Sequence, residues 1–345
     1  MAADKTLRLS VLAPEERDEW TSFVRQSPYG SAYSLPAYVE ALGAAVEGSA
    51  RTIIARRGES IAGGITVLER STPVGRVVAP RLLLYYNGFV LRDYDTRYPS
   101  QRAARHNEVV AALAEHLVSR RYSRLEIRSR SSLVDARPLL SGGWSASPSY
   151  TYIVPLDDLD QLWARVDQNL RRLVERARGL GFELVVGGEF DAFYELHVAT
   201  GERKDAPVYL PRTVFRDFYE TLAAQDLCTL YHAQDADGVV VASQLVLLGH
   251  PVTHTVSAAA DAGRQNSGSN PFLRWSVFEH LATQGYCAND LTDASLGPVA
   301  RFKSQLGGDL ALSFVTKRPE SAAYSAQRVA LGGVRRLRSR LGGSS

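Results

Sequence analysis

The residues best suited to chemistry lie between Gly238 and Asp309, where a polar loop at 265–270 precedes an apolar, helix-like run. Asn270 as N-cap, with Pro271 in the first helical position, predicts a helix start. Backbone N–H groups of such a loop, with the positive end of the helix dipole, can hold a pyrophosphate. An ordinary solvated loop has the same composition. The loop includes Gln265, Gly268 and Asn270.

A second candidate is a basic helix predicted over Leu159–Leu180, with apolar residues on one face. Its arginines are Arg165, Arg171, Arg172, Arg176 and Arg178. A cationic face can hold a phosphate-bearing substrate or an RNA backbone by charge, and it can equally be a solvated surface. We take Arg171 and Arg172 as candidate substrate-binding residues, and Arg171 is spaced to pair with Glu175.

Two further basic residues lie at positions from which they could bind an anion. Lys303 follows Phe302, and an aromatic side chain anchored in the core would give the lysine a fixed origin from which to reach a phosphate or carboxylate. Arg203 lies in the charged segment 202–205, predicted as a loop between helices, where it could clamp an anion while Glu202 or Asp205 acts as a base. A surface lysine and an exposed loop are the alternatives.

Tyr86 and Asp93 flank a predicted strand end at 87–89. Strand ends that face a cleft between domains commonly bind ligands, and half-buried rim tyrosines also occur there. The seven histidines are scattered, so no Ser/His/Asp, Cys/His or metal-binding pattern emerges. We therefore expect no metal site and no nucleophilic catalysis.

Composition sets wide bounds. A length of 345 residues predicts two domains, and a net charge of +3 is too small to argue by itself for nucleic acid. No apolar run reaches the ~20 residues of a membrane span, and the N-terminus has no signal-peptide apolar region. Cys228 and Cys287 are expected to be buried free thiols in a reducing compartment. We therefore expect a cytoplasmic protein, and contact with the inner face of a membrane stays open.

The elements that must position these residues follow one order twice: helix, hairpin, third strand, helix, strand and late strand. This order predicts an α/β fold (α+β, with mixed sheets) in two packed copies, with domains at 1–148 and 149–320 and a basic, flexible tail at 321–345. The expected helices include 31–42, 100–121, 159–180, 191–200 and 211–224. The expected strands include 51–68 and 227–248 as hairpins, then 74–84, 125–128, 150–156, 254–258, 287–291 and 310–316.

Taken together, these residues make the chain resemble the FemAB-related group of the GNAT acyltransferase superfamily, the aminoacyltransferases that build peptidoglycan interpeptide bridges. The resemblance runs from Trp20 to Phe314. Its most specific parts are the Arg-Arg helix at 169–181 and the Phe-Lys…Gly-Gly element at 302–308. The segments 34–38, 86–89 and 201–207 also contribute.

The resemblance implies two tandem GNAT-like domains with an acceptor cleft between them, and attack of an acceptor amine on an activated acyl group. Aminoacyl-tRNA is the donor in the best-known members, and no cofactor is bound permanently. Lys303 and Arg203 would hold the acceptor's phosphate or carboxylate, and Tyr86 and Asp93 would line the acceptor site. The oxyanion donors would be backbone amides near 247–257. The coiled-coil arm that some members insert in the second domain is absent, which leaves the donor open.

Three functions stay open. The first is aminoacyl transfer from tRNA to an amine on a cell-wall precursor or other small molecule. The second is acyl transfer from acyl-CoA, with the loop 265–270 as its cofactor site. The loop is similar to the Gln/Arg-x-x-Gly-x-Gly/Ala loop that holds the pyrophosphate of CoA in GNAT enzymes, and this resemblance implies Gln265, Gly268 and Asn270 as cofactor-binding residues, although Asn270 departs from the pattern. The third is a non-catalytic module in envelope or exopolysaccharide assembly. The oligomeric state is not predicted.

Overall fold

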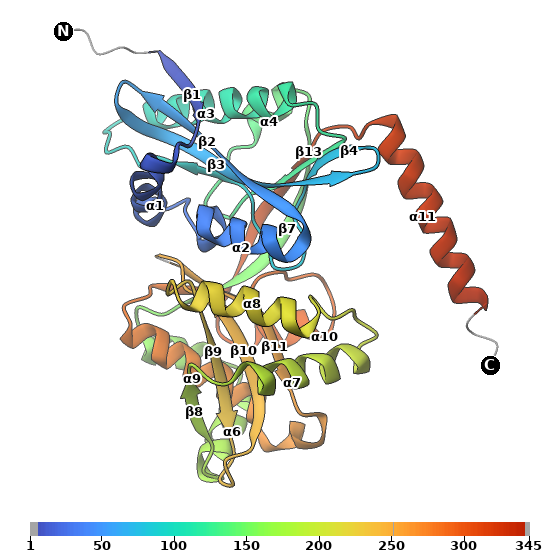
Figure 1. Cartoon of the computed structure of the whole chain (residues 1–345). Coiled ribbons are helices and arrows are strands. Elements are labelled where there is room, and N and C mark those ends of the chain that lie inside the picture. Colours follow the sequence, from blue (N-terminus) through green and yellow to red (C-terminus); the bar gives the residue numbers. More distant parts are fainter. Residues whose placement is uncertain (1–5, 251, 342–345) are drawn as a thin grey trace.

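The computed structural model describes residues 6–250 and 252–341, apart from the side chains at 265, 266 and 332–341. Within these residues one thirteen-stranded sheet runs through both halves of the molecule (Figure 1), in the order β1-β2-β3-β4-β6-β13-β7-β12-β11-β10-β9-β8 with β5 beside β3. Two pairs, β4–β6 and β11–β12, are parallel, and their neighbours are antiparallel. The predicted α/β fold with a mixed sheet is confirmed.

The first half packs helices on both faces of its strands. On β2, Ile54 faces the core beneath α1 and α2, whereas Ile53 and Ala55 face α3, as the alternation of a strand requires. The elements are β1 (Leu7–Val11), α1 (Arg17–Gln26), α2 (Pro36–Val46), β2 (Gly48–Arg57), β3 (Ser60–Thr72), β4 (Gly75–Val78), β5 (Phe89–Leu91), α3 (Pro99–Ser119), β6 (Arg124–Arg128) and α4 (Arg137–Ser141).

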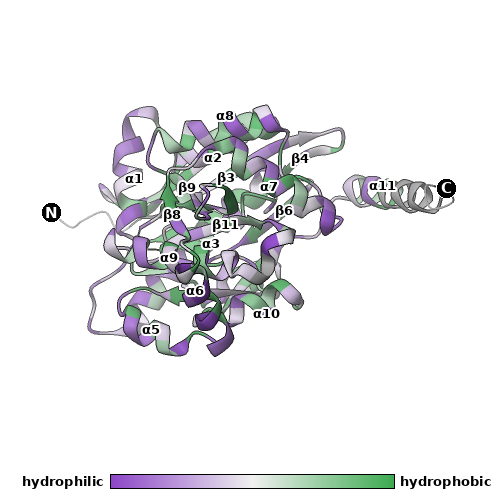
Figure 2. Ribbon diagram, turned by 90° about the horizontal axis from the view of Figure 1, so that it is seen from below, coloured by the Kyte–Doolittle hydropathy of each residue, from purple (hydrophilic) through white to green (hydrophobic). Residues whose placement is uncertain are grey.

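The second half repeats this layering. On β10, Leu245 faces the core under α7 and α8, and Val246 faces α6 and α9. The elements are β7 (Ser145–Pro155), α5 (Leu159–Arg165), α6 (Gln168–Gly179), β8 (Glu183–Val186), α7 (Phe190–Arg203), α8 (Arg212–Ala223), β9 (Cys228–Gln234), β10 (Val240–Leu247), β11 (Val252–Ala260), α9 (Ser269–Thr283), β12 (Ala288–Asp290), α10 (Pro298–Ser304), β13 (Asp309–Lys317) and α11 (Ala322–Leu341). Helix α11 projects from the body in Figures 1 and 2.

The predicted basic helix is wrong in one respect, because it is two helices. Val166 is extended, and the Asp167 side chain caps α6 by accepting a hydrogen bond from the Asn169 amide at 2.8 Å. An aspartate with its own cap geometry thus overrides the helical periodicity on either side. On α6, Glu175 pairs with Arg178 at 2.9 Å rather than with Arg171.

Three other expectations need correction. Helix α7 extends to Arg203, so Glu202 and Arg203 end a helix rather than lying in a loop. Cys287 is exposed, whereas Cys228 is buried as expected. The strand expected over 74–84 ends at Val78, where its pairing with β6 stops.

Strand β13 joins the two halves. It was expected to close the sheet of the second half, but it lies between β6 of the first half and β7. The expected boundary after residue 148 therefore falls inside β7, whose residues pair with β13 from Ser145 to Ile153. One hydrophobic cluster also combines Trp20 and Tyr38 of the first half with Phe193 and Phe215 of the second.

A buried carboxylate, Asp290 at the end of β12, ties the halves together. It accepts hydrogen bonds from the Tyr86 hydroxyl of the first half at 2.9 Å, from the Thr151 hydroxyl of β7, and from the Thr292 amide at 2.8 Å. Burial by itself would raise the pKa of Asp290, but neighbouring His254 and these hydrogen bonds outweigh it and lower the pKa. The carboxylate is therefore ionised and its oxygens are occupied.

We expect Tyr86→Phe to lower the free energy of unfolding by about 1–3 kcal/mol, because it removes a hydrogen bond from a buried charged acceptor. Urea unfolding of the full chain measures the change. Tyr98→Phe, at a tyrosine that is 53% exposed, is the matched control and should change little. Equal effects of the two substitutions would show that the bond between the halves does not stabilise the fold.

Candidate active site

The site begins where β11 and β12 separate. Strand β11 pairs with β10 along most of its length, but it pairs with β12 only over Val252–His254. Beyond Asp290 the chain leaves the sheet through Thr292 and Asp293, which both have positive φ angles. The edge of β11 from 255 to 260 therefore borders a wedge instead of a neighbouring strand.

Two backbone amides point into this wedge. The Asp261 amide donates to the Val241 carbonyl of β10 at 2.9 Å. This bond establishes which residues of β11 direct their amides toward β10. Because alternate residues of a strand direct their amides to opposite sides, the amides of Ala258 and Ala260 point away from β10. Methyl side chains at these positions leave room for a ligand beside them. Such donors can stabilise an oxyanion, and they lie just beyond the 247–257 segment expected for this role.

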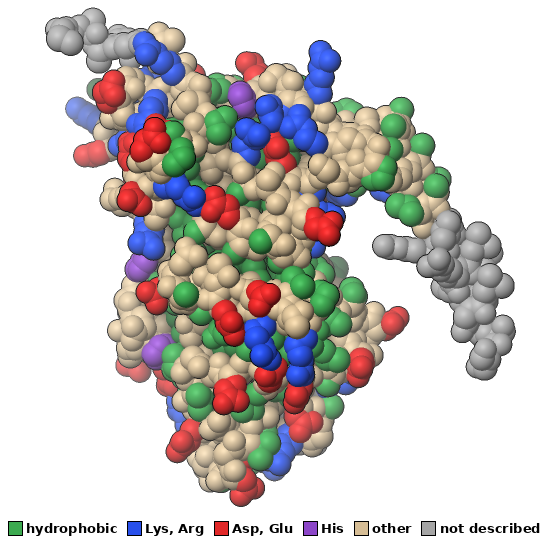
Figure 3. Space-filling view, in the orientation of Figure 1, with side chains coloured by type: hydrophobic (Ala, Val, Ile, Leu, Met, Phe, Trp, Pro, Cys, Tyr) green, Lys and Arg blue, Asp and Glu red, His purple; other side chains and the backbone are tan. Residues whose placement is uncertain are grey.

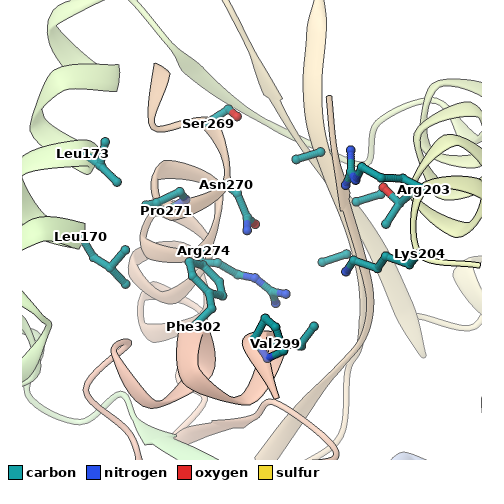
Figure 4. A pocket seen from close by; sticks show the side chains of 15 residues that line it. Leu170, Leu173, Arg203, Lys204, Ser269, Asn270, Pro271, Arg274, Val299 and Phe302 are labelled. Atoms are coloured by element: carbon teal, nitrogen blue, oxygen red, sulfur yellow. The ribbon is translucent and has the colours of Figure 1, made fainter. Parts of the chain in front are cut away.

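A pocket of about 470 Å³ opens beside these amides. It is lined by residues of α6, the end of α7, β11, the first turns of α9, and α10. Figure 4 shows Asn270, Arg274 and Phe302 on one side of it, with Arg203 and Lys204 approaching from the other. Among the described residues that line it, none is Asp or Glu. The pocket is therefore positively charged.

Arg274, in the second turn of α9, is the most buried of these cations. Its side chain is 6% exposed, and its Nε and Nη1 atoms have no hydrogen-bond partner in the described structure. Burial lowers the pKa of Arg274 to about 10. Burial, and then the charges of Arg203 and Arg274, also lower the pKa of Lys204. These cations act on one another without a carboxylate between them.

Lys303 lies next to the pocket on α10, after Phe302, which lines it and packs on the core as expected. The Lys303 ammonium donates to the carbonyls of Thr292 and, at 2.7 Å, Asp293, which fixes its position at the turn that follows β12. Burial, and then the charge of Arg274, lower the pKa of Lys303 to about 8. An ammonium has three donors, so one more can serve a ligand.

The predicted phosphate loop is only partly as expected. Helix α9 begins at Ser269, and its N-cap is Gly268, so the prediction that Asn270 caps the helix is wrong. Asn270 lies inside the first turn and lines the pocket. Gly268 has a φ of +86°, and a Cβ there would lie 2.2 Å from the Leu173 carbonyl oxygen of α6. The glycine is thus required by packing and backbone conformation. The Gln265 side chain lies outside the described residues.

The arginines expected on the basic helix have different surroundings in the structure. Leu170 and Leu173 line the pocket from α6, so Arg171 and Arg172 lie beside it without lining it. Arg165 pairs with Asp309, and Arg178 pairs with Glu175 and, at 2.7 Å, with Glu279. Arg172 and Arg176 are exposed.

Tyr86 and Asp93 lie away from this pocket. Tyr86 is buried in the core between the halves, where its hydroxyl binds Asp290. Asp93 is exposed in the segment between β5 and α3. The structure thus brings Arg203, Asn270 and Lys303 together and leaves these two residues in the first half.

Two features were missed in the sequence. Arg274 is a single charge within the apolar run of α9, between Leu273 and Trp275, and a lone cation on a buried helix is a readable signal.

The second missed feature is His197. Its Nε2 atom accepts a hydrogen bond from the Tyr209 amide at 3.3 Å, so the proton is on Nδ1. Nδ1 lies 3.3 Å from the Ser257 hydroxyl. Burial lowers the pKa of His197 to about 4. It is neutral and cannot take a proton from Ser257 through Nδ1.

Comparison with known proteins agrees with this geometry. Residues 164–304 match the family described as Acetyltransferase (GNAT) domain. The structure of FemX is similar with a TM-score of 0.69 at 14% identity, over 88% of this chain and 96% of that one. The C-terminal domain of a putative lysylphosphatidylglycerol synthetase from Agrobacterium fabrum gives 0.57 at 13% identity, over 93% and 96% of the two chains.

A tandem GNAT protein from the clavulanic acid biosynthesis pathway gives a TM-score of 0.52 at 14% identity, over 92% of this chain and all (100%) of the other. A search of the curated proteins finds no match. In the part of this chain that the structure describes, no helix is both long and apolar enough to cross a membrane. Residues 164–304, in the second half of the chain, thus match the GNAT acetyltransferase domain, and the chain as a whole has the fold seen in FemX and in this tandem GNAT protein.

Proposed function

We propose that this protein is an N-acyltransferase that moves an acyl or aminoacyl group from an activated donor to an amine. The observation that carries the proposal is the wedge at β11, where the amides of Ala258 and Ala260 border a cationic pocket. Amides held in a sheet need little reorganisation when charge develops on a carbonyl oxygen, so they stabilise the tetrahedral intermediate.

The reaction needs no strong catalytic base. The neutral amine nitrogen attacks the acyl carbon and forms the new C–N bond. The C–O bond of an ester, or the C–S bond of a thioester, then breaks. The proton lost by the amine goes, directly or through water, to the leaving oxygen or sulfur. Because the donor is already activated, positioning and oxyanion stabilisation supply most of the rate.

Aminoacyl-tRNA is the donor we favour. The exposed Arg172 and Arg176 extend the positive charge of the pocket along α6, beyond the reach of a small ligand. This charge is local, because the face seen in Figure 3 mixes acidic and basic side chains. Under this proposal Lys303 and Arg203 hold a phosphate or carboxylate of the substrate. An amine on a cell-wall precursor is the acceptor class that follows from the FemAB resemblance, and it leaves a role at the inner membrane surface open.

Acyl-CoA is the second candidate donor. The first turn of α9 has no side-chain cap, and the Phe272 amide donates to the Gly268 carbonyl at 2.9 Å. The amides of Ser269 and Asn270, which both line the pocket, are therefore the ones that could meet a pyrophosphate. Gln265 is a candidate cofactor-binding residue only under this alternative. A non-catalytic role is the third, and the experiment below separates it from both enzymes.

The test is a donor screen with the full chain. The protein is mixed with charged tRNAs or acyl-CoAs and a set of amines, and amides are detected by mass spectrometry. We expect transfer from aminoacyl-tRNA, with kcat/KM about tenfold to a hundredfold lower in Lys303→Ala, because a charge-assisted hydrogen bond is lost. Lys317→Ala, at an exposed lysine of β13, is the control.

Transfer from acyl-CoA alone would replace the favoured donor by the second one. No transfer from either class, with tRNA and CoA both failing to bind, would reject the enzyme proposal in favour of a non-catalytic module.

The reaction should also depend on pH through Lys303. Its pKa is lowered to about 8, so its charge is present below that pH and is lost above it. We expect the KM for the anionic donor to rise as the pH increases through this range. Lys303→Arg keeps its charge, so its KM should stay flat. A wild-type KM that does not change between pH 7 and about 9, roughly one unit on each side of that pKa, would show that the lysine charge does not bind the donor.

A further inference from the structure

We propose that Arg274 and Lys204 form an anion subsite inside the pocket, separate from the backbone amides at the start of α9, and that its ligand is a phosphate group of a substrate. The inference deepens the proposed function, on which it rests, by naming a group that the substrate must carry. It also assigns a binding role to two residues that the family resemblance does not supply.

The burial of Arg274 is the first step. Its side chain is 6% exposed, and among the described residues it has no carboxylate partner and no acceptor for Nε or Nη1. A buried charge and a buried donor without partners each destabilise a folded protein. An apolar side chain of similar length would fit the same position on a helix whose other buried residues, apart from Ser269 and Ser276, are apolar. The guanidinium therefore weakens the ligand-free fold.

The position of Arg274 is the second step. Its guanidinium extends into the pocket in Figure 4, between Asn270 and Val299, on the side that faces Lys204. Arg274 comes from α9, and Lys204 follows α7, so two independent elements direct cations to one space. The pKa of Lys204 is lowered by burial first and then by the charges of Arg203 and Arg274, which places the three cations within electrostatic reach of one another.

The charge of the pocket is the third step. Arg203, Lys204 and Arg274 line it, Lys303 stands next to it, and no described acidic residue lines it. A dianion placed among these groups would give Arg274 its missing acceptors and relieve the mutual repulsion. A planar guanidinium with two free N–H donors suits a tetrahedral phosphate, which it can bind in a bidentate manner. A neutral chain in this space would leave the guanidinium unpaired.

The test uses Arg274→Met in the full chain, with thermal unfolding measured in the presence and absence of inorganic pyrophosphate. We expect opposite effects in the two conditions. Without the anion the variant should unfold at a higher temperature than the wild type, because an unpaired buried charge is gone. With pyrophosphate present, the unfolding temperature of the wild type should rise and that of the variant should not, because the variant binds pyrophosphate about tenfold to a hundredfold more weakly.

Arg274→Lys keeps the positive charge but lacks the planar guanidinium that can bind a phosphate in a bidentate manner. This variant should retain part of the stabilisation by pyrophosphate. Arg70→Met, at an exposed arginine of β3 in the first half, should leave both unfolding temperatures nearly unchanged. Lys204→Gln provides a second variant if Arg274→Met does not fold, and it should also weaken the response to pyrophosphate. CoA, the trinucleotide CCA and UDP then distinguish a thioester donor, an RNA donor and a nucleotide-linked acceptor as the source of the phosphate.

The proposal fails if pyrophosphate does not stabilise the wild type. It also fails if Arg274→Met lowers the unfolding temperature without the anion while the response persists, because Arg274 would then be a structural residue. Neither readout depends on acyl transfer. An anion response in a protein that transfers no acyl group would keep the subsite and reject the proposed function.

Discussion

The buried carboxylate of Asp290 is the interaction on which the site depends. It receives a hydroxyl from each of Tyr86 and Thr151, and its bond to the Thr292 amide turns the chain out of the sheet at the end of β12. That turn separates β12 from β11, so the same charge both joins the two halves and opens the wedge. Lys303 then binds the carbonyls of the turn, which places its ammonium beside the pocket.

The site and the fold make opposite demands on this region. Packing favours an apolar interior, and the second-half core is apolar around α9, yet cations from three elements meet beside it. Depressed pKa values at Lys303 and Arg274 reflect the same conflict, because burial opposes their charge. Residues that reduce stability and cluster in a cavity are typical of binding sites.

Sequence reasoning recovered the parts of the molecule that follow from local pattern. The hairpins predicted at 51–68 and 227–248 and the anchor at Phe302 all follow from residues close together in the chain. It failed where distant residues decide. Nothing near Leu310 in the sequence indicates that β13 enters between β6 and β7. The sequence around Arg274 likewise does not show that its buried Nε and Nη1 are left without an acceptor among the described residues. The break at Asp167 was local and readable, but the strong periodicity of the basic helix concealed it.

The position of β13 has a consequence for how the chain is made. During synthesis the first half leaves the ribosome long before residues 309–317 do. Until those residues emerge, β6 and β7 each lack β13, the strand that lies between them in the native sheet. Exposed strand edges invite pairing with other chains. The central sheet therefore cannot be completed until residues 309–317 have been made, and a fragment that ends before β13 would keep two open edges.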